Sequence, residues 1–332
     1  MRTTHRTYRS QTLATRIWPA VTLGLALAAF AAPLAAQTTD ASMAVALKDT
    51  DGTKGWLLKR GTTVLASKNA DHVFEPASTI KFLHHLHAEL MMQNYGVNPQ
   101  QPISGTSLYS GSCPVVTWWN GWTEPLEDAM YKMMWNSDNA RTEAIKTYFG
   151  EDAINGTAKA LGAVNTELNH TLGCGDDAVV HPNKLTLTDA STLYRKAFTG
   201  DLLTPERRQH MWAKMPNKLQ ALKDTATWEA AVTYGIAVPK PIADNLKVAV
   251  KGGSYTLCSY IFLGGCNKYY RSIAGYVEIP FQTAYGIPVS FKYTFGIFID
   301  KATNEHNADE AIQQAIAEIF RLELRKAIAS FL

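Results

Sequence analysis

The sequence predicts a mixed α/β fold, in which one antiparallel sheet is assembled from both ends of the chain and flanked by helices. Runs rich in β-branched and aromatic residues occur before residue 70 and again after residue 246. Between these regions, and again at the C-terminus, apolar residues recur at helical spacing. The order of strands, helices, strands and a final helix indicates an all-helical lobe inserted between the two halves of an α/β lobe.

The individual elements follow from the same signals. Apolar runs punctuated by Asp-Gly, Lys-Gly and Arg-Gly near the N-terminus favour antiparallel hairpins. The predicted strands are 43–49, 55–61, 62–67, 247–250, 255–263, 271–279 and 293–300. The predicted helices are 79–93, 126–136, 140–149, 151–161, 188–198 and about 307–328.

The first 36 residues have the features of a secretory signal peptide. Four arginines and no acid precede an apolar run, 17–36, that ends in small residues. We predict cleavage near Ala36 and a periplasmic or secreted protein without stable membrane insertion. A retained anchor is the alternative, because the run approaches membrane-spanning length. The predicted domains are a signal peptide, 1–36, and one catalytic domain, 37–332, whose α/β lobe comprises 40–70 and about 240–332 and whose helical lobe comprises about 71–239.

Without the leader, the charges nearly balance. Four of the 32 Lys and Arg residues lie in the leader, so 28 basic residues remain against 29 acidic ones. No Lys- or Arg-rich block remains, which argues against nucleic acid as a partner. We expect the protein to be a monomer whose partner is a small-molecule substrate.

All four cysteines lie in the predicted mature chain. An even count in an exported protein predicts two disulfides, for which four cysteines allow three pairings. We favour Cys258–Cys266 as a local staple and, by elimination, Cys113–Cys174. A structural zinc site is the alternative, weakened by the absence of a CxxC pair. His84 and His87 have no carboxylate partner at matching spacing, so we predict no metal.

Three short motifs carry the candidate chemistry. They are Ser78-Thr-Ile-Lys81, Ser137-Asp-Asn139 and Lys251-Gly-Gly253. A serine hydroxyl needs a base within hydrogen-bond reach, and Lys81 lies one helical turn after Ser78. Burial and the charge of Lys251 would lower the pKa of Lys81 enough for it to act as that base. Ser137 could relay a proton to a leaving nitrogen, while Asn139 could hold Lys81 and a substrate carbonyl or amide.

The three motifs in this order resemble the SxxK, SDN and K[ST]G triple of class A β-lactamases and penicillin-binding proteins. The resemblance covers nearly the whole mature chain and implies that no metal or organic cofactor is needed. It also implies that Gly253 and Ser254 line the substrate site. The backbone N–H groups of Ser78 and Ser254 would form an oxyanion hole. Gly252 stands where the family usually has Ser or Thr, so one hydroxyl contact to a substrate carboxylate is missing.

Two further positions follow from the resemblance. Arg271 matches the strand arginine that binds the substrate carboxylate in many class A enzymes. The glutamate that activates the deacylating water has no counterpart, because Asn165 stands in its place in the segment 165–169. Acids that could substitute for it are Glu167, Asp176 and Asp177.

These features predict an exported serine hydrolase. The first expectation is a class A-like β-lactamase that hydrolyses the β-lactam amide through a Ser78 acyl-enzyme. A D-Ala-D-Ala carboxypeptidase or penicillin-binding protein acting on a D-Ala-D-Ala-like peptide, or an esterase of the same superfamily, is the alternative. An acylation-only β-lactam sensor is a third reading, and a binding module with accidental motifs is more remote.

Overall fold

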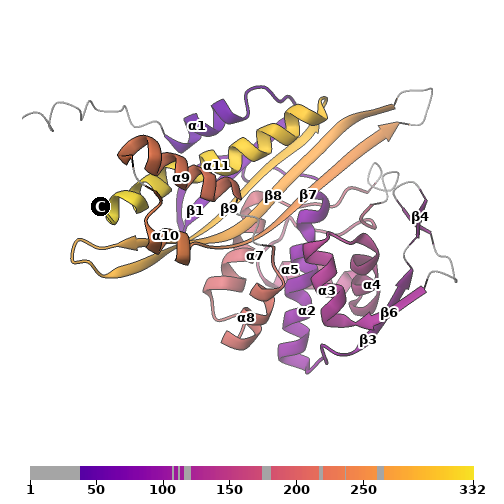
Figure 1. The fold of residues 1–332 in the computed structure, drawn as a ribbon. Coiled ribbons are helices and arrows are strands. Elements are labelled where there is room, and N and C mark those ends of the chain that lie inside the picture. The colour runs from indigo at the N-terminus through magenta and orange to yellow at the C-terminus, as the bar shows by residue number, and fades with distance from the viewer. Residues whose placement is uncertain are drawn as a thin grey trace, which may run out of the picture. The chain divides into compact units, whose positions relative to one another are not determined.

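A computed structural model describes the chain from residue 38 to residue 332, except 107, 111–112, 116–120, 174–180, 217–219, 236 and 260–264. The predicted signal peptide and two of the candidate acids, Asp176 and Asp177, lie outside the described residues. The described part contains a five-stranded antiparallel sheet with helices packed on both faces (Figure 1). This architecture confirms the predicted fold class.

The main sheet has the strand order β2-β1-β9-β8-β7. Its strands are β1 (Thr53–Arg60), β2 (Thr63–Lys68), β7 (Lys247–Ser259), β8 (Gly265–Gln282) and β9 (Pro288–Ala302). Strand β1 pairs with β9, so both ends of the chain contribute to the sheet, as predicted. The two segments predicted at 247–250 and 255–263 form one continuous strand, β7, at the edge of the sheet. The described residues also form two small two-stranded sheets: β3 (Pro102–Thr106) with β6 (Gly121–Pro125), and β4 (Leu108–Ser110) with β5 (Cys113–Val115).

One face of the sheet is covered by helices that share one apolar cluster with the strands. These helices are α1 (Thr39–Ala46), α9 (Gln220–Tyr234), α10 (Lys240–Asn245) and α11 (Glu305–Ser330). The prediction of a strand at 43–49 is wrong, because this segment lies largely in α1. Met43 and Leu47, four residues apart, are buried, whereas Val45 is 58% exposed, which is the spacing of a helix face.

Helices α9 and α10 were not predicted. Leu222, Ala226 and Ala230 of α9 pack in the same cluster as α11, on the face of the sheet away from the helical lobe. Helix α9 thus lies within the sequence range predicted for the helical lobe, 71–239, but it packs against α11 on the opposite face of the sheet.

The other face of the sheet carries the helical lobe. Its elements are the 3-10 turn η1 (Ala77–Ile80), α2 (Lys81–Tyr95), α3 (Leu126–Trp135), α4 (Asn139–Phe149), α5 (Glu151–Ala160), α7 (Leu187–Thr199) and α8 (Pro205–Ala213). Five of these helices were predicted to within two residues at each end, and α8 was not. Helix α2 is central, because every residue from Lys81 to Leu90 is buried. A helix enclosed on all sides can hold a side chain in a fixed place.

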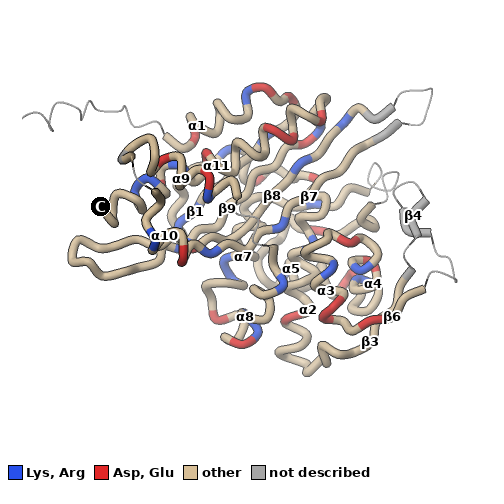
Figure 2. Tube along the Cα trace, viewed as in Figure 1, with Lys and Arg blue, Asp and Glu red and all other residues tan. Residues whose placement is uncertain are grey.

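Acidic and basic residues are interspersed along the described elements (Figure 2). Within the described residues, no helix has both the length and the apolar character needed to cross a membrane.

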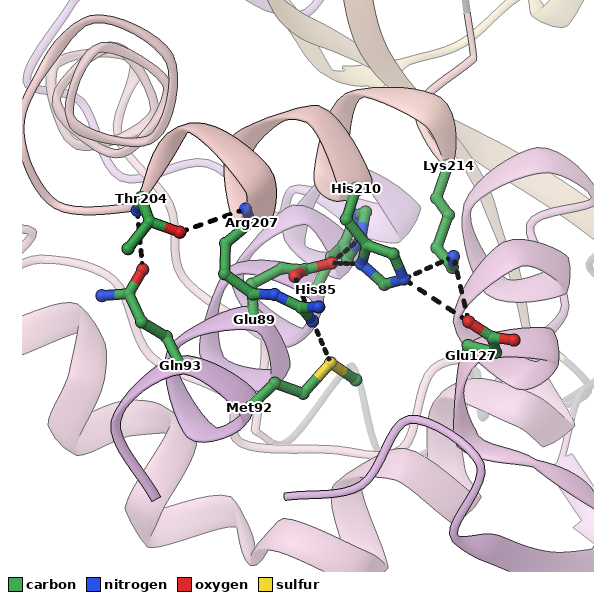
Figure 3. Close-up of polar contacts among 9 residues, drawn as sticks. All are labelled: His85, Glu89, Met92, Gln93, Glu127, Thr204, Arg207, His210 and Lys214. Atoms are coloured by element: carbon green, nitrogen blue, oxygen red, sulfur yellow. Dashed lines mark hydrogen bonds and ion pairs between the residues drawn. The ribbon is translucent and has the colours of Figure 1, made fainter. Parts of the chain in front are cut away.

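A buried ionic network fastens the middle of α2 to α8 and α3 (Figure 3). The Glu89 carboxylate is fully buried and accepts a hydrogen bond of 2.6 Å from His210 Nδ1 of α8. His85 Nε2 lies 3.4 Å from the same carboxylate. On the far side of His210, Lys214 Nζ donates to the imidazole at 2.8 Å, and Glu127 of α3 lies within 3.7 Å of Lys214. Burial alone would raise the pKa of Glu89, but its contacts with His210 and His85 lower it to about 2.

We predict that Glu89→Gln lowers the free energy of unfolding by about 3 kcal/mol at pH 7. The folded-state pKa lies below the ordinary value of 4.5, so Glu89 stabilises the protein above pH 4.5. That stabilisation is lost as the pH falls towards 2. Denaturant titrations at pH 7 and pH 3 should therefore show a smaller difference between wild type and variant at pH 3. The matched control is Glu310→Gln, whose side chain is 59% exposed. An equal effect of the two substitutions would contradict the prediction.

Candidate active site

Ser78 lies in the tight turn that leads into α2. The preceding residue, Ala77, has a φ of 48°, a left-handed conformation that costs energy for a residue with a Cβ atom. The turn is held from both sides. The Glu75 carboxylate accepts a hydrogen bond from the Ala77 N–H at 3.2 Å, and Ser272 Oγ donates to Pro76 O at 2.6 Å. Ser78 is therefore presented on a braced, strained backbone.

Lys81 is buried beneath this turn. Its Nζ donates to Ser137 O at 2.6 Å, to Ser137 Oγ at 3.2 Å and to Asn139 Oδ1 at 2.5 Å. Burial, and secondarily the charge of Lys251, lowers the pKa of Lys81 well below its usual value. The described residues show no hydrogen bond between Lys81 and the Ser78 hydroxyl. Catalytic hydrogen bonds are often long in free enzymes and tighten only when substrate is bound.

Ser137 and Asn139 are positioned by the start of α4. Asp138 is the N-cap residue, and its carboxylate accepts a hydrogen bond from the Arg141 N–H at 2.9 Å. The Arg141 side chain also pairs with Asp138, so the Asp138 carboxylate braces the start of α4. Ser137 itself has a φ of 56°. The α4 cap therefore fixes an unfavourable backbone at the residue that contacts both lysines.

Lys251 reaches the site from β7. Its Nζ donates to Ser137 Oγ at 3.0 Å and to Gly252 O at 2.7 Å. Ser137 Oγ thus lies between two lysine amines, one from the helical lobe and one from the sheet. This arrangement can move a proton between Lys81 and a group bound on the β7 side of Ser137.

The two glycines after Lys251 differ in their surroundings. A Cβ atom at Gly253 would lie 2.7 Å from Pro76 O and from the Ser78 backbone nitrogen. A Cβ atom at Gly252 would meet only Ser272 O, at 3.6 Å. Glycine is therefore required at 253 by the protein's own nucleophile turn, whereas 252 has room for a side chain. Ser254 follows this contact and lines the same cleft as Ser78, and the backbone N–H groups of the two residues are the pair expected to bind an oxyanion.

These groups open into a cleft of about 970 Å³. Its wall includes Ser78, Ser137, Lys251, Ser254 and Arg271, so the structure brings these predicted residues together. The cleft runs along the edge strand β7 and continues over α9 and α11. An edge strand with free backbone groups can pair with an extended substrate.

Arg271 lines the cleft but has partners of its own. Its guanidinium is 6% exposed, donates to Glu305 at 2.7 Å and pairs with Asp309, both from α11. These carboxylates raise the pKa of Arg271 against the effect of burial and neutralise its charge. A substrate carboxylate would have to share Arg271 with two acids.

Of the three predicted substitute acids, the structure describes Glu167, and this residue does not meet the nucleophile. Glu167 pairs with Lys184 at 2.7 Å across a β-bridge, and it does not line the cleft. In the same loop, the backbone N–H of Asn165 donates a hydrogen bond to the Asp189 carboxylate at 2.8 Å. The described wall of the cleft contains two carboxylates, Glu305 and Asp309, and both are paired with Arg271.

The cysteines are described only in part. Strand register places Cys258 opposite Cys266 in the β7–β8 hairpin. The side chains of both, that of Cys113 and the whole of Cys174 lie outside the described part of the chain. Both disulfides stay predictions.

Sequence reasoning missed the residues that join the two lobes. Thr79 Oγ1 hydrogen-bonds Ser272 Oγ at 2.7 Å and Lys251 O at 3.3 Å. The small hydroxyl residue at 79, next to Ser78 in the first motif, is the one sequence signal for this connection. Ser272 gave none, because its strand reads as ordinary apolar sequence.

Comparisons with known proteins agree with this fold. A family model described as "Beta-lactamase enzyme family" matches residues 38–321. A comparison with curated protein sequences finds no match.

Solved structures share the fold at low sequence identity. A class A beta-lactamase from Bacteroides cellulosilyticus is 19% identical, with a TM-score of 0.63, and the match covers 87% of this chain and 99% of that one. A beta-lactamase from Chitinophaga pinensis is 14% identical, with a TM-score of 0.64 over 86% of this chain and 98% of that one. A point mutant of PBP-A, solved as an acyl-enzyme complex with penicillin G, is 18% identical, with a TM-score of 0.61 over 86% of this chain and 95% of that one.

We predict that Gly253→Ala separates β7 from the nucleophile turn, because the new methyl group would overlap Pro76 O and the Ser78 amide. The free energy of unfolding should fall by about 1–3 kcal/mol, measured by denaturant titration. Gly252→Ala is the matched control and should stay within about 0.5 kcal/mol of wild type. Equal losses in the two variants would show that the close approach at residue 253 is not the constraint.

Proposed function

Because the chain belongs to the beta-lactamase enzyme family, we propose that it is a serine hydrolase in which Ser78 attacks the carbonyl carbon of a β-lactam. The observation that carries the proposal is the buried amine of Lys81, one turn after Ser78 and hydrogen-bonded to Ser137 and Asn139. A lysine whose pKa is lowered well below normal can accept the serine proton near neutral pH. D-Ala-D-Ala-like peptide amides present the same reacting group.

In the proposed acylation, the Ser78 Oγ–carbon bond forms while its proton passes to Lys81. Negative charge on the carbonyl oxygen is stabilised by the backbone N–H groups of Ser78 and Ser254. The carbon–nitrogen bond then breaks, and Ser137 passes a proton from Lys81 to the leaving nitrogen. Lys251 lies beside Ser137, where its positive charge attracts the carboxylate of a bound substrate. The same charge lowers the pKa of Lys81 and so favours its neutral form. Hydrolysis of the acyl-enzyme by water completes the reaction.

A second candidate function is acylation without efficient release, as in a penicillin-binding protein or a β-lactam sensor. It is favoured by one observation. Both carboxylates in the described wall of the cleft, Glu305 and Asp309, are held by ion pairs with Arg271, away from the position of a base for a deacylating water.

Export of the protein is part of the proposal. The basic and apolar leader, 1–36, supports a periplasmic or secreted location. Such a location suits an enzyme that meets β-lactams or cell-wall peptides.

We predict that wild-type protein reacts with a chromogenic cephalosporin and that Ser78→Ala lowers the rate at least about 10³-fold, because the nucleophile is removed. Ser290→Ala, at an exposed serine outside the cleft, is the control. Sustained turnover in wild type identifies a β-lactamase. A burst of about one equivalent, with an acyl adduct on Ser78 by mass spectrometry, identifies the acylation-only alternative. Unchanged reaction in Ser78→Ala would overturn both.

A second prediction concerns the pH dependence of acylation. Neutral Lys81 is the active form, so the rate should fall as the pH drops through the lowered pKa of Lys81. The Lys251→Met substitution removes a charge that holds this pKa down, and the midpoint should move to higher pH. The measurement is the rate of acylation by a fluorescent penicillin as a function of pH. Lys48→Met, at an exposed lysine, should leave the midpoint in place. A midpoint unmoved by Lys251→Met would contradict the role given to Lys81.

A further inference from the structure

A second cavity, of about 310 Å³, lies beside the nucleophile turn. On the helical-lobe face of the sheet, Gly253 pairs with Ser272, and both contact the turn. The next row on the same face is the pair Tyr255 and Tyr270, which lines the cavity. Two residues along a strand span about 7 Å, so the cavity begins about that far from the point where β7 contacts Ser78.

Two buried carboxyl groups form part of the wall. Glu75 and Asp300 are 8% and 7% exposed, and the Glu75 N–H donates to Asp300 Oδ2 at 3.3 Å. Burial, with the Glu75 charge adding to it, raises the pKa of Asp300 to about 7. The negative charge of Glu75 disfavours ionised Asp300, so a positive charge between or beside the two carboxyl groups would stabilise both.

The tyrosine next to these acids has an unused hydroxyl. Tyr270 is 6% exposed and lines the cavity, and none of the described residues hydrogen-bonds its hydroxyl. Its ring lies 5.3 Å from that of Tyr255, so two aromatic rings stand beside the two carboxyl groups. Aromatic rings and carboxylates together are the surroundings that bind ammonium groups in proteins. The Tyr270 hydroxyl can also donate to or accept from a polar ligand atom in the cavity.

Two lysines line the cavity, and the charge of Lys301 partly offsets the rise in the pKa of Asp300. Lys184 is paired with Glu167 at 2.7 Å, and Lys301 is exposed. His170 lies 3.4 Å from Glu75. The His170 ring also contacts Thr171 O at 2.9 Å and the Asn183 side chain at 2.8 Å, and His170 does not line the cavity.

The position of the cavity along β7 indicates which part of a substrate lies nearest to it. The leaving nitrogen belongs beside Ser137 and Lys251, towards the start of β7. A substrate paired with this edge strand therefore directs its acyl part the other way, past Gly253 towards Tyr255 and Leu257. The cavity lies at that end.

We propose that this cavity binds a primary ammonium group carried on the acyl part of the substrate, held by Asp300, Glu75 and the Tyr270 hydroxyl. The inference rests on the proposed acylation of Ser78 and names the substrate class, an amide whose acyl portion ends in an amine.

The first test uses two penicillins of equal length: 6-aminopenicillanic acid acylated with 6-aminohexanoic acid, and the same nucleus acylated with heptanoic acid. They differ by an ammonium in place of a methyl group. The second-order rate constant for acylation should be about tenfold higher for the amine in wild type. In Asp300→Asn, which keeps an acceptor for the Glu75 N–H, this ratio should fall to about one. In Tyr270→Phe it should fall part of the way. Asp201→Asn, at an exposed acid, is the matched control and should keep the tenfold ratio.

Equal rates for the two penicillins in wild type would overturn the inference and leave the proposed function intact. Failure of both penicillins to acylate Ser78 would overturn the proposed function instead, and the cavity is then tested alone. Calorimetric titration at constant ionic strength compares n-hexylammonium chloride with hexan-1-ol. Saturable binding of the amine, at least tenfold weaker in Asp300→Asn, supports the ammonium site. Absence of such binding overturns it.

Discussion

Strand β7 packs so closely against the turn that carries Ser78 that Gly253 has no room for a side chain. A Cβ atom at Gly253 would lie 2.7 Å from the Ser78 nitrogen, and hydroxyl groups of Thr79 and Ser272 close the contact with hydrogen bonds. Ser78 and Lys81 belong to the helical lobe, whereas Lys251 and Ser254 belong to the sheet. Their mutual geometry depends on this seam, because buried and hydrogen-bonded backbone cannot slide without breaking several contacts at once.

The chemistry depends in turn on two positive side chains sharing one hydroxyl. Lys81 and Lys251 both donate to Ser137 Oγ, and their repulsion favours a neutral Lys81. Such an arrangement is unfavourable by itself, as are the left-handed backbones at Ala77 and Ser137. The surrounding structure must compensate. The α4 cap holds Ser137, and the ionic network between α2, α3 and α8 fixes the helix that carries Lys81.

The sequence predicted the fold class, the long strands and most helices of the lobe, because their apolar periodicity is sustained over many residues. The short run at 43–49 was misassigned. Over seven residues its apolar pattern suits a strand or a helix, and only packing of Met43 and Leu47 against the far end of the chain decides between them.

The residues of the candidate site also differ in whether a local sequence pattern reveals them. Ser78, Lys81, Ser137 and Lys251 stand in short local motifs and could be found from sequence. The partners of Arg271 lie 34 and 38 residues further on, in α11, and no local pattern joins them. Glu75, Tyr270 and Asp300 come from three separated segments, and only the strand register and the turn before α2 bring them together.

The strand order has a consequence for how the chain reaches its native state. Strand β1 ends at residue 60 and pairs with β9, which begins at residue 288, so the middle of the sheet cannot close until nearly the whole chain is available. Contacts of such long sequence separation form slowly, since the loop entropy is lost before the pairing compensates it. The helices of the lobe, rich in local contacts, can form earlier. Ser78 and Lys251 also come from distant parts of the chain, so reactivity of the serine reports a late stage of folding and not an early one.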